Sequence, residues 1–285
     1  TSVPTSEIVA KILSCCCNDG GFAWFEGMDS SPVVTAVLLQ RYASLKKRGI
    51  IDPQTSAIPQ NTVENAVKYL DKTYFGDRNR PYWCGGLSWD QYVSTRAMFP
   101  EVSFATQNFD SKALKDFRKE IKEYLTPKKE RGLNGYILGK ARRMAVLLEL
   151  SASDEGRNLA GSWGITLGAR NKLLKSLNKD LLSIEEYAIE HKSGGWYYPN
   201  AVMPFRGLLE SEAFAHSFIA DLLTECQTAL RNVADETSLK KAGEIAEGIR
   251  LWLMVQKETQ KWGEEPAYVD ALASVLAGSD EVKAT

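Results

Sequence analysis

The chain contains 285 residues, of which 44% are hydrophobic, and its 35 basic and 36 acidic side chains nearly cancel. This hydrophobic share is sufficient for a buried core, in one large domain or two ordinary ones. The balanced charge predicts no nucleic-acid partner, and no apolar run is long enough to insert directly into a membrane. We expect residues 1–285 to form a single domain excised from a larger protein, because the sequence begins and ends abruptly without a signal segment.

The first predicted helix ends in a turn rich in glycine and aromatic residues. This turn is Gly20-Gly21-Phe22-Ala23-Trp24-Phe25, and its two glycines permit a tight bend that would bring the aromatic side chains inward. Ser31 and Pro32 suit the N-cap and the first position of the next helix, which is apolar over residues 33–45.

Four further helices are predicted before residue 151 from apolar spacing and capping residues. They cover residues 63–70, residues 92–98 after a capping box of Ser88 and Gln91, residues 114–125 after the cap Asp110, and residues 136–150. The last of these is apolar on most faces and is therefore expected to be central.

The middle of the chain is harder to assign. Residues 158–177 are ambiguous, because Gly161, Gly164 and Gly168 each weaken a helix. Ser183 and Glu186 repeat the capping-box pattern, which predicts that a helix starts at Ser183 and continues to about His191.

The glycine-aromatic turn returns twice in the second half of the chain. One copy is Gly194-Gly195-Trp196-Tyr197-Tyr198-Pro199, followed by a helix over 208–223, and a shortened copy is Gln260-Lys261-Trp262-Gly263, followed by a helix over 265–276. Ile245, Ile249 and Trp252 mark another helix between these copies.

These elements predict an all-α fold with about eleven or twelve helices and short connections. A helix pair cannot bury its apolar stripe alone, so the pairs are expected to stack on one another. The unequal spacing of the aromatic turns argues against regular short repeats. It favours an α/α toroid of antiparallel helix pairs, with an open solenoid as the alternative.

Neither cysteine nor histidine predicts a metal site or a cofactor. The five cysteines are Cys15, Cys16, Cys17, Cys84 and Cys226, and we expect the three adjacent ones to be buried small residues on the first helix. No C-x-x-C spacing occurs, and the role of the three adjacent cysteines stays open. The only histidines, His191 and His216, are expected to be solvated or hydrogen-bonded.

The chain contains NDGGFAWFEG at 18–27, GGWYY at 194–198 and RLWLMVQKETQKW at 250–262. Together these segments resemble the bacterial alpha-2-macroglobulin-like family, in the forms found in Bacteroides-like bacteria. The segment 18–27, NDGGFAWFEG, resembles the family's N-x-DG-x-W-x-W-x-x-G pattern, and Gly194–Tyr198 followed by LESEA at 209–213 resembles its later aromatic turn and E-T-x-A helix. RLWLMVQKETQKW at 250–262 resembles the more specific W-L-x-x-Q-K-x-T-Q-x-W signature. The resemblance runs from about Glu7 to Leu276 in the same order.

The resemblance implies a thioester-type domain, an α/α toroid similar in shape to terpenoid cyclases and complement thioester domains. It also implies neighbouring β-sandwich domains, a place in the cell envelope that is periplasmic or membrane-anchored through the parent protein, and proteases or other proteins as partners. Members with the thioester trap proteases through a Cys–Gln bond, which needs the two residues three positions apart. Here the residues three positions after the cysteines are Asn18, Asp19, Gly20, Leu87 and Ala229.

The chain is therefore predicted to be a thioester-free, non-catalytic domain that acts in protease inhibition or protein binding. Whether a longer protein carries a thioester upstream stays open. The candidate binding-surface aromatics are Trp24, Phe25, Trp196, Tyr197 and Trp262, although the same residues could instead fill the core between helices.

Two other functions remain open at this stage. A carbohydrate-active toroid enzyme, a glycosidase or lyase, would need two carboxylates across a cleft, and the candidates are Asp19, Glu26, Asp29, Asp77 and Asp90. A structural spacer without any protease partner is the third possibility. A deep pocket with paired carboxylates would favour the enzyme.

Overall fold

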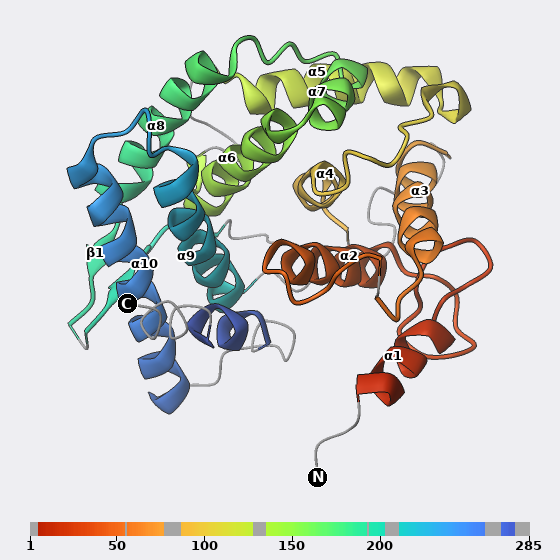
Figure 1. The fold of residues 1–285 in the computed structure, drawn as a ribbon, viewed down its shortest axis with the longest axis horizontal. Helices are drawn as coiled ribbons and strands as arrows, with labels where there is room; N and C mark the ends of the chain where they lie inside the picture. Colours follow the sequence, from red (N-terminus) through yellow and green to blue (C-terminus); the bar gives the residue numbers. More distant parts are fainter. Residues whose placement is uncertain are drawn as a thin grey trace. The chain divides into compact units, whose positions relative to one another are not determined.

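The computed structural model describes residues 5–54, 56–76, 87–127, 135–192, 194–202, 211–259 and 269–276. These residues are mostly helical (Figure 1), which confirms the predicted all-α class. They divide into two compact units. The first unit is Thr1–Lys122 with Ala152–Ile165, and the second is Glu123–Ser151 with Thr166–Thr285.

Among the residues that the structure describes, the first unit contains six complete helices and most of a seventh. Its second helix packs against both the third and the fourth. The elements are α1 (Thr5–Ser14), α2 (Pro32–Lys47), α3 (Gln60–Gly76), α4 (Trp89–Ala97), the short 3₁₀ helix η2 (Thr106–Asn108), α7 (Asp154–Ser162) and most of α5 (Ser111–Leu125).

Aromatic side chains fill the core of this unit. Phe75 stacks on Phe109 with ring centroids 4.7 Å apart and meets Phe117 edge-on at 5.2 Å. Trp163, which is fully buried, meets Phe117 edge-on at 5.7 Å. Aromatic pairs in these geometries contribute beyond the area that they bury, so this cluster holds α3, α5 and the end of α7 together.

A buried ion pair crosses the same core between α3 and α4. The Arg96 side chain is fully buried, and its Nε donates to both carboxylate oxygens of Asp71 at 3.1 Å. Its remaining nitrogens donate to the carbonyl oxygens of Phe99 and Val102, each at 2.6 Å, while the Tyr92 hydroxyl donates to Asp71 at 2.7 Å. Since a buried charge needs complete pairing, this network fixes the segment that follows α4.

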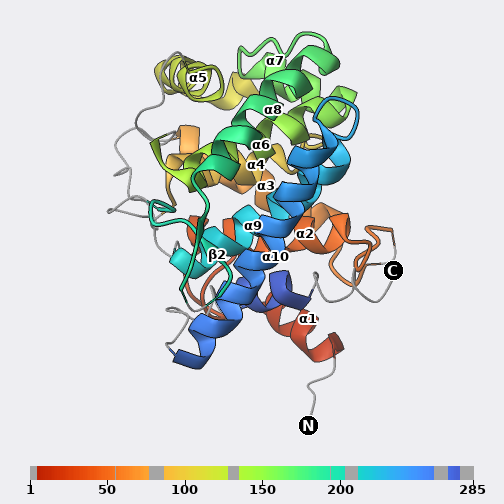
Figure 2. The ribbon, with the colours of Figure 1, turned by 90° about the vertical axis from the view of Figure 1, so that its left-hand side faces the viewer.

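The second unit contains the longest of the described helices and a small hairpin. This helix, α10 (Glu236–Thr259), packs along α9 (Glu212–Ala229), and strand β2 (Trp196–Tyr197) of the hairpin lies on α10 (Figures 1 and 2). The elements are α6 (Ile137–Ala152), α8 (Arg170–Glu186), β1 (Ile189–Glu190), β2 (Trp196–Tyr197), α9 (Glu212–Ala229) and α10 (Glu236–Thr259), and residues 269–276 are also helical.

A polar network ties the helix over 269–276 to α9 and α10. The Ser274 hydroxyl donates to Asp221 at 2.8 Å on α9. Arg250 on α10 donates to Thr224 at 3.0 Å and lies 3.5 Å from the same Asp221 carboxylate. The helix predicted to follow the W-L-x-x-Q-K signature is therefore present and anchored.

Several sequence predictions are confirmed by this structure. Ser88 and Gln91 form the predicted capping box at the start of α4, and the Asp110 carboxylate accepts from the backbone nitrogen of Ala113 at 2.7 Å. Helix α6 is buried on nearly all faces, as its apolar sequence predicted.

The prediction that a helix starts at Ser183 is wrong. Ser183 lies inside α8, which continues to Glu186, and the chain then enters β1 rather than a helix reaching His191. The side chain of Ser183 instead accepts a hydrogen bond from Lys140 at 3.1 Å. The apolar stripe of α8, which includes Leu177, Leu181 and Ile184, runs through the position without a break, and it overrides the local capping signal.

Among the helices described, none is both long enough and apolar enough to cross a membrane. The chain divides into two units that are each compact. Whether they form a single domain stays a prediction.

We expect Asp71→Asn to lower the free energy of unfolding by about 3–5 kcal/mol, because Arg96 would keep its charge and lose its carboxylate. The matched control is Glu101→Gln, which breaks the exposed pair with Lys46 at 3.2 Å and should cost less than about 1 kcal/mol. Urea denaturation of both variants measures the difference. Equal losses would contradict the role given to the buried pair.

Candidate functional site

The first glycine-aromatic turn is closed by two backbone hydrogen bonds. The nitrogen of Gly20 donates to the carbonyl oxygen of Cys17 at 3.0 Å, and the nitrogen of Cys17 donates to Gly21 at 2.8 Å. Cys16 and Phe22 then pair as an isolated antiparallel bridge. Gly20 has a φ of +90°, which only glycine adopts easily, so the sequence dictates this bend.

The second turn has the same backbone hydrogen bonds at equivalent positions. Gly194 donates to His191 at 2.8 Å, and His191 donates to Gly195 at 2.9 Å. Glu190 and Trp196 pair where Cys16 and Phe22 pair in the first turn, and Gly194 has a φ of +91°. The predicted return of the turn is therefore a structural repeat, in which Gly20 corresponds to Gly194.

The first turn lies directly against α3, with no room for a side chain at either glycine. A Cβ atom on Gly20 would lie 2.7 Å from the carbonyl oxygen of Asn65, and one on Gly21 would lie 2.7 Å from the ring of Tyr69. Asn65 and Tyr69 are four residues apart and thus share one face of α3.

The second turn lies against α10 through its second glycine, whereas a Cβ atom on Gly194 would lie 3.9 Å from Leu251, an ordinary contact. A Cβ atom on Gly195 would collide with the carbonyl oxygen of Gly248 and would lie 2.7 Å from the nitrogen of Trp252. The Trp196 ring fills the space where a Gly248 side chain would be, and Tyr197 stacks on Trp252 with centroids 6.0 Å apart. Gly248 and Trp252 are again four residues apart, so each turn docks on one helical face.

In the first turn, a side chain from α2 captures the backbone amide of the buried aromatic residue. The nitrogen of Phe22 donates to the Thr35 hydroxyl at 2.8 Å, and that hydroxyl donates to the carbonyl oxygen of Ser31 at 2.8 Å. The nitrogen of Ser31, the N-cap of α2, donates in turn to the carbonyl oxygen of Phe22 at 2.8 Å. These bonds fix the start of α2 to the turn.

His216 has the corresponding role in the second turn, two residues further along the strand. The nitrogen of Tyr198 donates to His216 Nε2 at 3.0 Å, which leaves Nδ1 to donate to the carbonyl oxygen of Glu212 at 2.6 Å. Burial lowers the pKa of His216 to about 4, so its ring is neutral at pH 7 and can accept this bond. The predicted hydrogen-bonded role of His216 is confirmed.

The two turns differ in what they do with the aromatic residues that follow. Tyr198 is buried, with 2% of its surface exposed, and Trp24 at the equivalent position is 46% exposed. The neighbouring Phe25 is 70% exposed and Met28 is 52% exposed. The turn on α10 is therefore a core element, and the turn on α3 carries an apolar surface loop.

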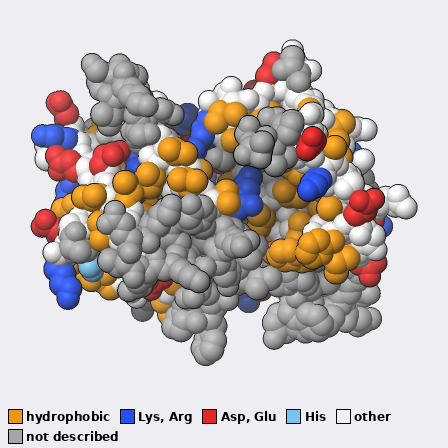
Figure 3. All heavy atoms as spheres, turned by 90° about the horizontal axis from the view of Figure 1, so that it is seen from below, with side chains coloured by type: hydrophobic (Ala, Val, Ile, Leu, Met, Phe, Trp, Pro, Cys, Tyr) orange, Lys and Arg blue, Asp and Glu red, His pale blue; other side chains and the backbone are white. Residues whose placement is uncertain are grey.

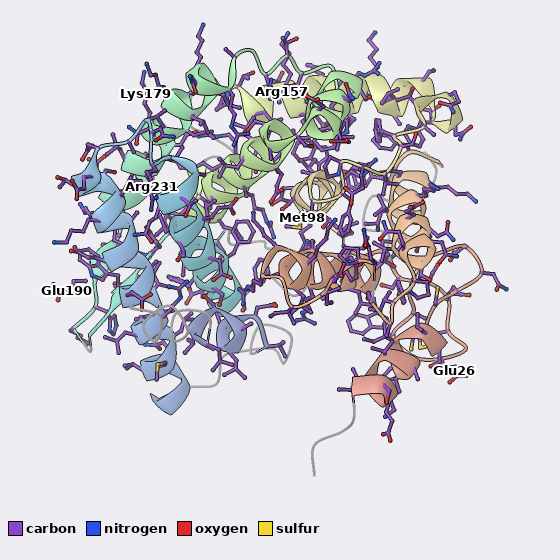
Figure 4. All side chains as sticks on the ribbon, viewed as in Figure 1. Glu26, Met98, Arg157, Lys179, Glu190 and Arg231 are labelled. Carbon is purple, nitrogen blue, oxygen red and sulfur yellow. The ribbon has the colours of Figure 1, made fainter. Side chains whose placement is uncertain are left out.

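This surface loop, residues 23–30, has a fixed neck and an open tip. Asp19 holds the neck, because its carboxylate accepts from the nitrogen of Gly21 at 3.0 Å and from the Ser30 hydroxyl at 2.6 Å. At the tip, the nitrogen of Met28 donates to the carbonyl oxygen of Phe25 at 3.2 Å. Figure 4 labels Glu26 at the outer edge of this loop.

The structure separates the predicted binding-surface aromatics into two groups. Trp24 and Phe25 lie on the surface, so the prediction that the first turn brings its aromatic side chains inward is wrong for them and holds for Phe22. The reason is that the loop closes back on Phe22 through Ser31, which leaves positions 24 and 25 beyond the neck. Trp196 and Tyr197 are partly buried on α10, and Trp262 lies outside the described residues.

The prediction that the three adjacent cysteines lie on the first helix is wrong. Helix α1 ends at Ser14, and the cysteines lead into the turn with partly buried side chains. Burial and the nearby Asp19 carboxylate raise the pKa of Cys16 and Cys17, which makes them weak nucleophiles. No group of three metal-binding side chains occurs among the described residues. Cys84 lies outside the described residues.

Sequence reasoning missed the residues that receive the turns. Asn65, Tyr69 and Thr35 belong to no recognisable motif, although Thr35 lies one helical turn after the N-cap Ser31.

Comparison with protein-family models, with curated proteins and with solved structures finds no match to this chain.

We expect Gly20→Ala to destabilise the protein by several kcal/mol, because it adds both an unfavourable φ and a collision with Asn65. Gly27→Ala is the matched control in the same loop, since Gly27 also has a positive φ, +83°, but meets nothing within 4 Å. It should cost only about 1–2 kcal/mol. Thermal and urea unfolding compare the two variants, and equal losses would contradict the docking of the turn on α3.

The lowered pKa of His216 predicts a pH-dependent stability. Unfolding returns the imidazole to its ordinary pKa of 6.5, so the unfolded state binds more protons as the pH falls from 6.5 to about 4. The free energy of unfolding should therefore decrease over this range, by up to an amount on the order of 3 kcal/mol, and change no further through this group at lower pH.

Urea unfolding between pH 7 and pH 4 tests this prediction in three proteins. His216→Gln should lose this part of the pH dependence, and His191→Gln should keep it. A His216→Gln protein with the same pH profile as the wild type would contradict the assignment.

Proposed function

We propose that this chain is a thioester-free, non-catalytic domain of a bacterial alpha-2-macroglobulin-like protein, acting in protease inhibition or protein binding. The observation that carries the proposal is the repeated turn. Two turns with the same backbone hydrogen bonds, each docked on a helical face, occur at the two places where the sequence resembles the aromatic turns of that family.

The order of elements around the turns supports the same proposal. In the first unit a helix, the turn and two packed helices follow one another as α1, α2 and α3, and in the second unit α8, α9 and α10 repeat that order. An α/α toroid is a closed ring of such helix pairs, and we propose that the helix pairs of this chain form such a ring. An experimental structure in which the pairs form an open array would contradict it.

A non-covalent mode of action follows from the cysteine chemistry. None of the five cysteines has a glutamine three residues later, and the raised pKa values of Cys16 and Cys17 disfavour the thiolate that is needed to form a thioester. Under this proposal the partners are proteases or other proteins, together with β-sandwich domains of the same protein, at the cell envelope.

The alternative of a glycosidase or lyase has no observation to carry it. Asp19 holds the neck of the surface loop, and Asp90 accepts from the Ser88 hydroxyl at 2.8 Å at the start of α4. Glu26 and Asp29 lie on the exposed loop, and Asp77 lies outside the described residues. Local structure thus accounts for two of the five candidate carboxylates, and it pairs none of the four described ones across a cleft.

The function is tested on the full-length natural protein. After incubation with proteases of several classes, we expect the protease to be retained, to keep activity on small peptides and to lose activity on large proteins. Retention should survive pretreatment with methylamine, which attacks thioesters, because the proposed mechanism is not covalent.

The outcomes of this experiment separate the alternatives. Retention that methylamine abolishes would indicate a thioester elsewhere in the longer protein and would contradict the non-covalent mechanism. Absence of retention with every protease would contradict the inhibitor function, and turnover in a glycan screen would then favour the enzyme.

A further inference from the structure

The tip of the surface loop presents three exposed apolar side chains that lie within five residues of one another. Hydrophobic side chains also reach the surface elsewhere, as Figure 3 shows for one face, and an exposed apolar side chain is by itself ordinary. Trp24, Phe25 and Met28 differ because they fall within five residues of one loop, each about half exposed or more.

Comparison of the two turns shows that Trp24 does not take the buried place that its equivalent, Tyr198, takes. In the second turn, Tyr198 at the position of Trp24 is buried and its backbone nitrogen is bound by His216. In the first turn, the equivalent bond is made two residues earlier, by Phe22 to Thr35. Trp24 is therefore released from the core, and its indole ring is available to another molecule.

The neck of the loop makes it suitable for binding. Asp19, Ser31 and Thr35 hold both ends of the loop through hydrogen bonds to the backbone or to Ser30. An apolar tip on a fixed base loses little conformational entropy when it enters a partner, so more of the burial energy appears as affinity. Tryptophan is also among the residues that most often dominate binding energy.

The charges of the tip favour a protein partner over a membrane. Glu26 and Asp29 lie exposed between and beside the apolar residues, and the loop from 20 to 30 contains no lysine or arginine. Carboxylates at this place repel an anionic lipid surface, whereas they complement lysine or arginine side chains at the rim of a cleft.

We propose that residues 24–29 form a binding loop that inserts Trp24, Phe25 and Met28 into an apolar cleft of a partner protein whose rim is basic. This proposal rests on the protein-binding function proposed above and names the surface that performs it. Aromatic side chains bury about 150–250 Å² each, so the loop supplies the centre of an interface of about 800 Å² per partner and not its whole area.

The experiment measures binding of the full-length protein to active-site-blocked proteases of several classes by biolayer interferometry. The Trp24→Ala/Phe25→Ala protein should bind about 30-fold or more weakly than the wild type. The matched control is Ile8→Ala/Ile50→Ala, which removes two exposed apolar side chains of the same unit outside the loop and should bind as the wild type does. Unfolding by urea should show only small and similar losses of stability in both, because the removed side chains are at most about half buried.

A second variant tests the charges. Glu26→Gln/Asp29→Asn should lower the association rate severalfold at low salt, with the difference shrinking as salt is added. Equal association rates at all salt concentrations would contradict the basic rim.

Each remaining outcome has a distinct meaning. Binding that survives Trp24→Ala/Phe25→Ala would overturn the binding loop and leave the proposed function intact. Failure of the wild type to bind any blocked protease would overturn the binding loop as a protease contact, whereas retention of active protease in the experiment described above would still support the proposed function. Binding of the wild type, but not of this variant, to phosphatidylcholine vesicles containing phosphatidylserine would overturn the protein partner and assign the loop to a membrane.

Discussion

In each unit the structure depends on two contacts made by a glycine turn. The turn packs closely against one helix, and a side chain of a second helix accepts a hydrogen bond from a backbone amide just after the turn. At Gly20 and Gly195 the backbone occupies space that any Cβ atom would share with a carbonyl oxygen. The amides of Phe22 and Tyr198 would be buried without a partner if Thr35 and His216 did not accept from them. An unsatisfied buried amide costs about 1–3 kcal/mol, so each turn positions the helix that follows it.

The same constraint permits the two turns to diverge beyond the captured amide. On α10 the aromatic residues Trp196 and Tyr197 pack against Gly248 and Trp252, which requires a glycine in the middle of a long helix. On α3 the loop closes at Ser31, so Trp24 and the residues after it have no core to enter. Both turns thus hold their helices in place, and the first one in addition presents side chains at the surface.

Much of the fold could be predicted from local signals. The Ser88–Gln91 box, the Asp110 cap and the apolar sequence of α6 each specify their element without help from distant residues. The turns could be recognised from their glycines, but the direction of Trp24 could not, because it depends on a bond between Phe22 and Ser31 across the loop. Ser183 failed as a helix start for a similar reason, since the apolar stripe of α8 continues through it. Asn65 and Thr35 lack any motif, and only the packed structure shows their role.

Amide hydrogen exchange measured by NMR tests the central claim most directly, because it reports on each captured amide separately. The amides of Phe22 and Tyr198 should exchange as slowly as those of the neighbouring helices, whereas the amides of Trp24 and Phe25, for which no acceptor is seen in the described structure, should exchange orders of magnitude faster. Rapid exchange at Phe22 and Tyr198 would show that the turns are not held by α2 and α9, and it would contradict both the structural repeat and the fixed neck of the binding loop.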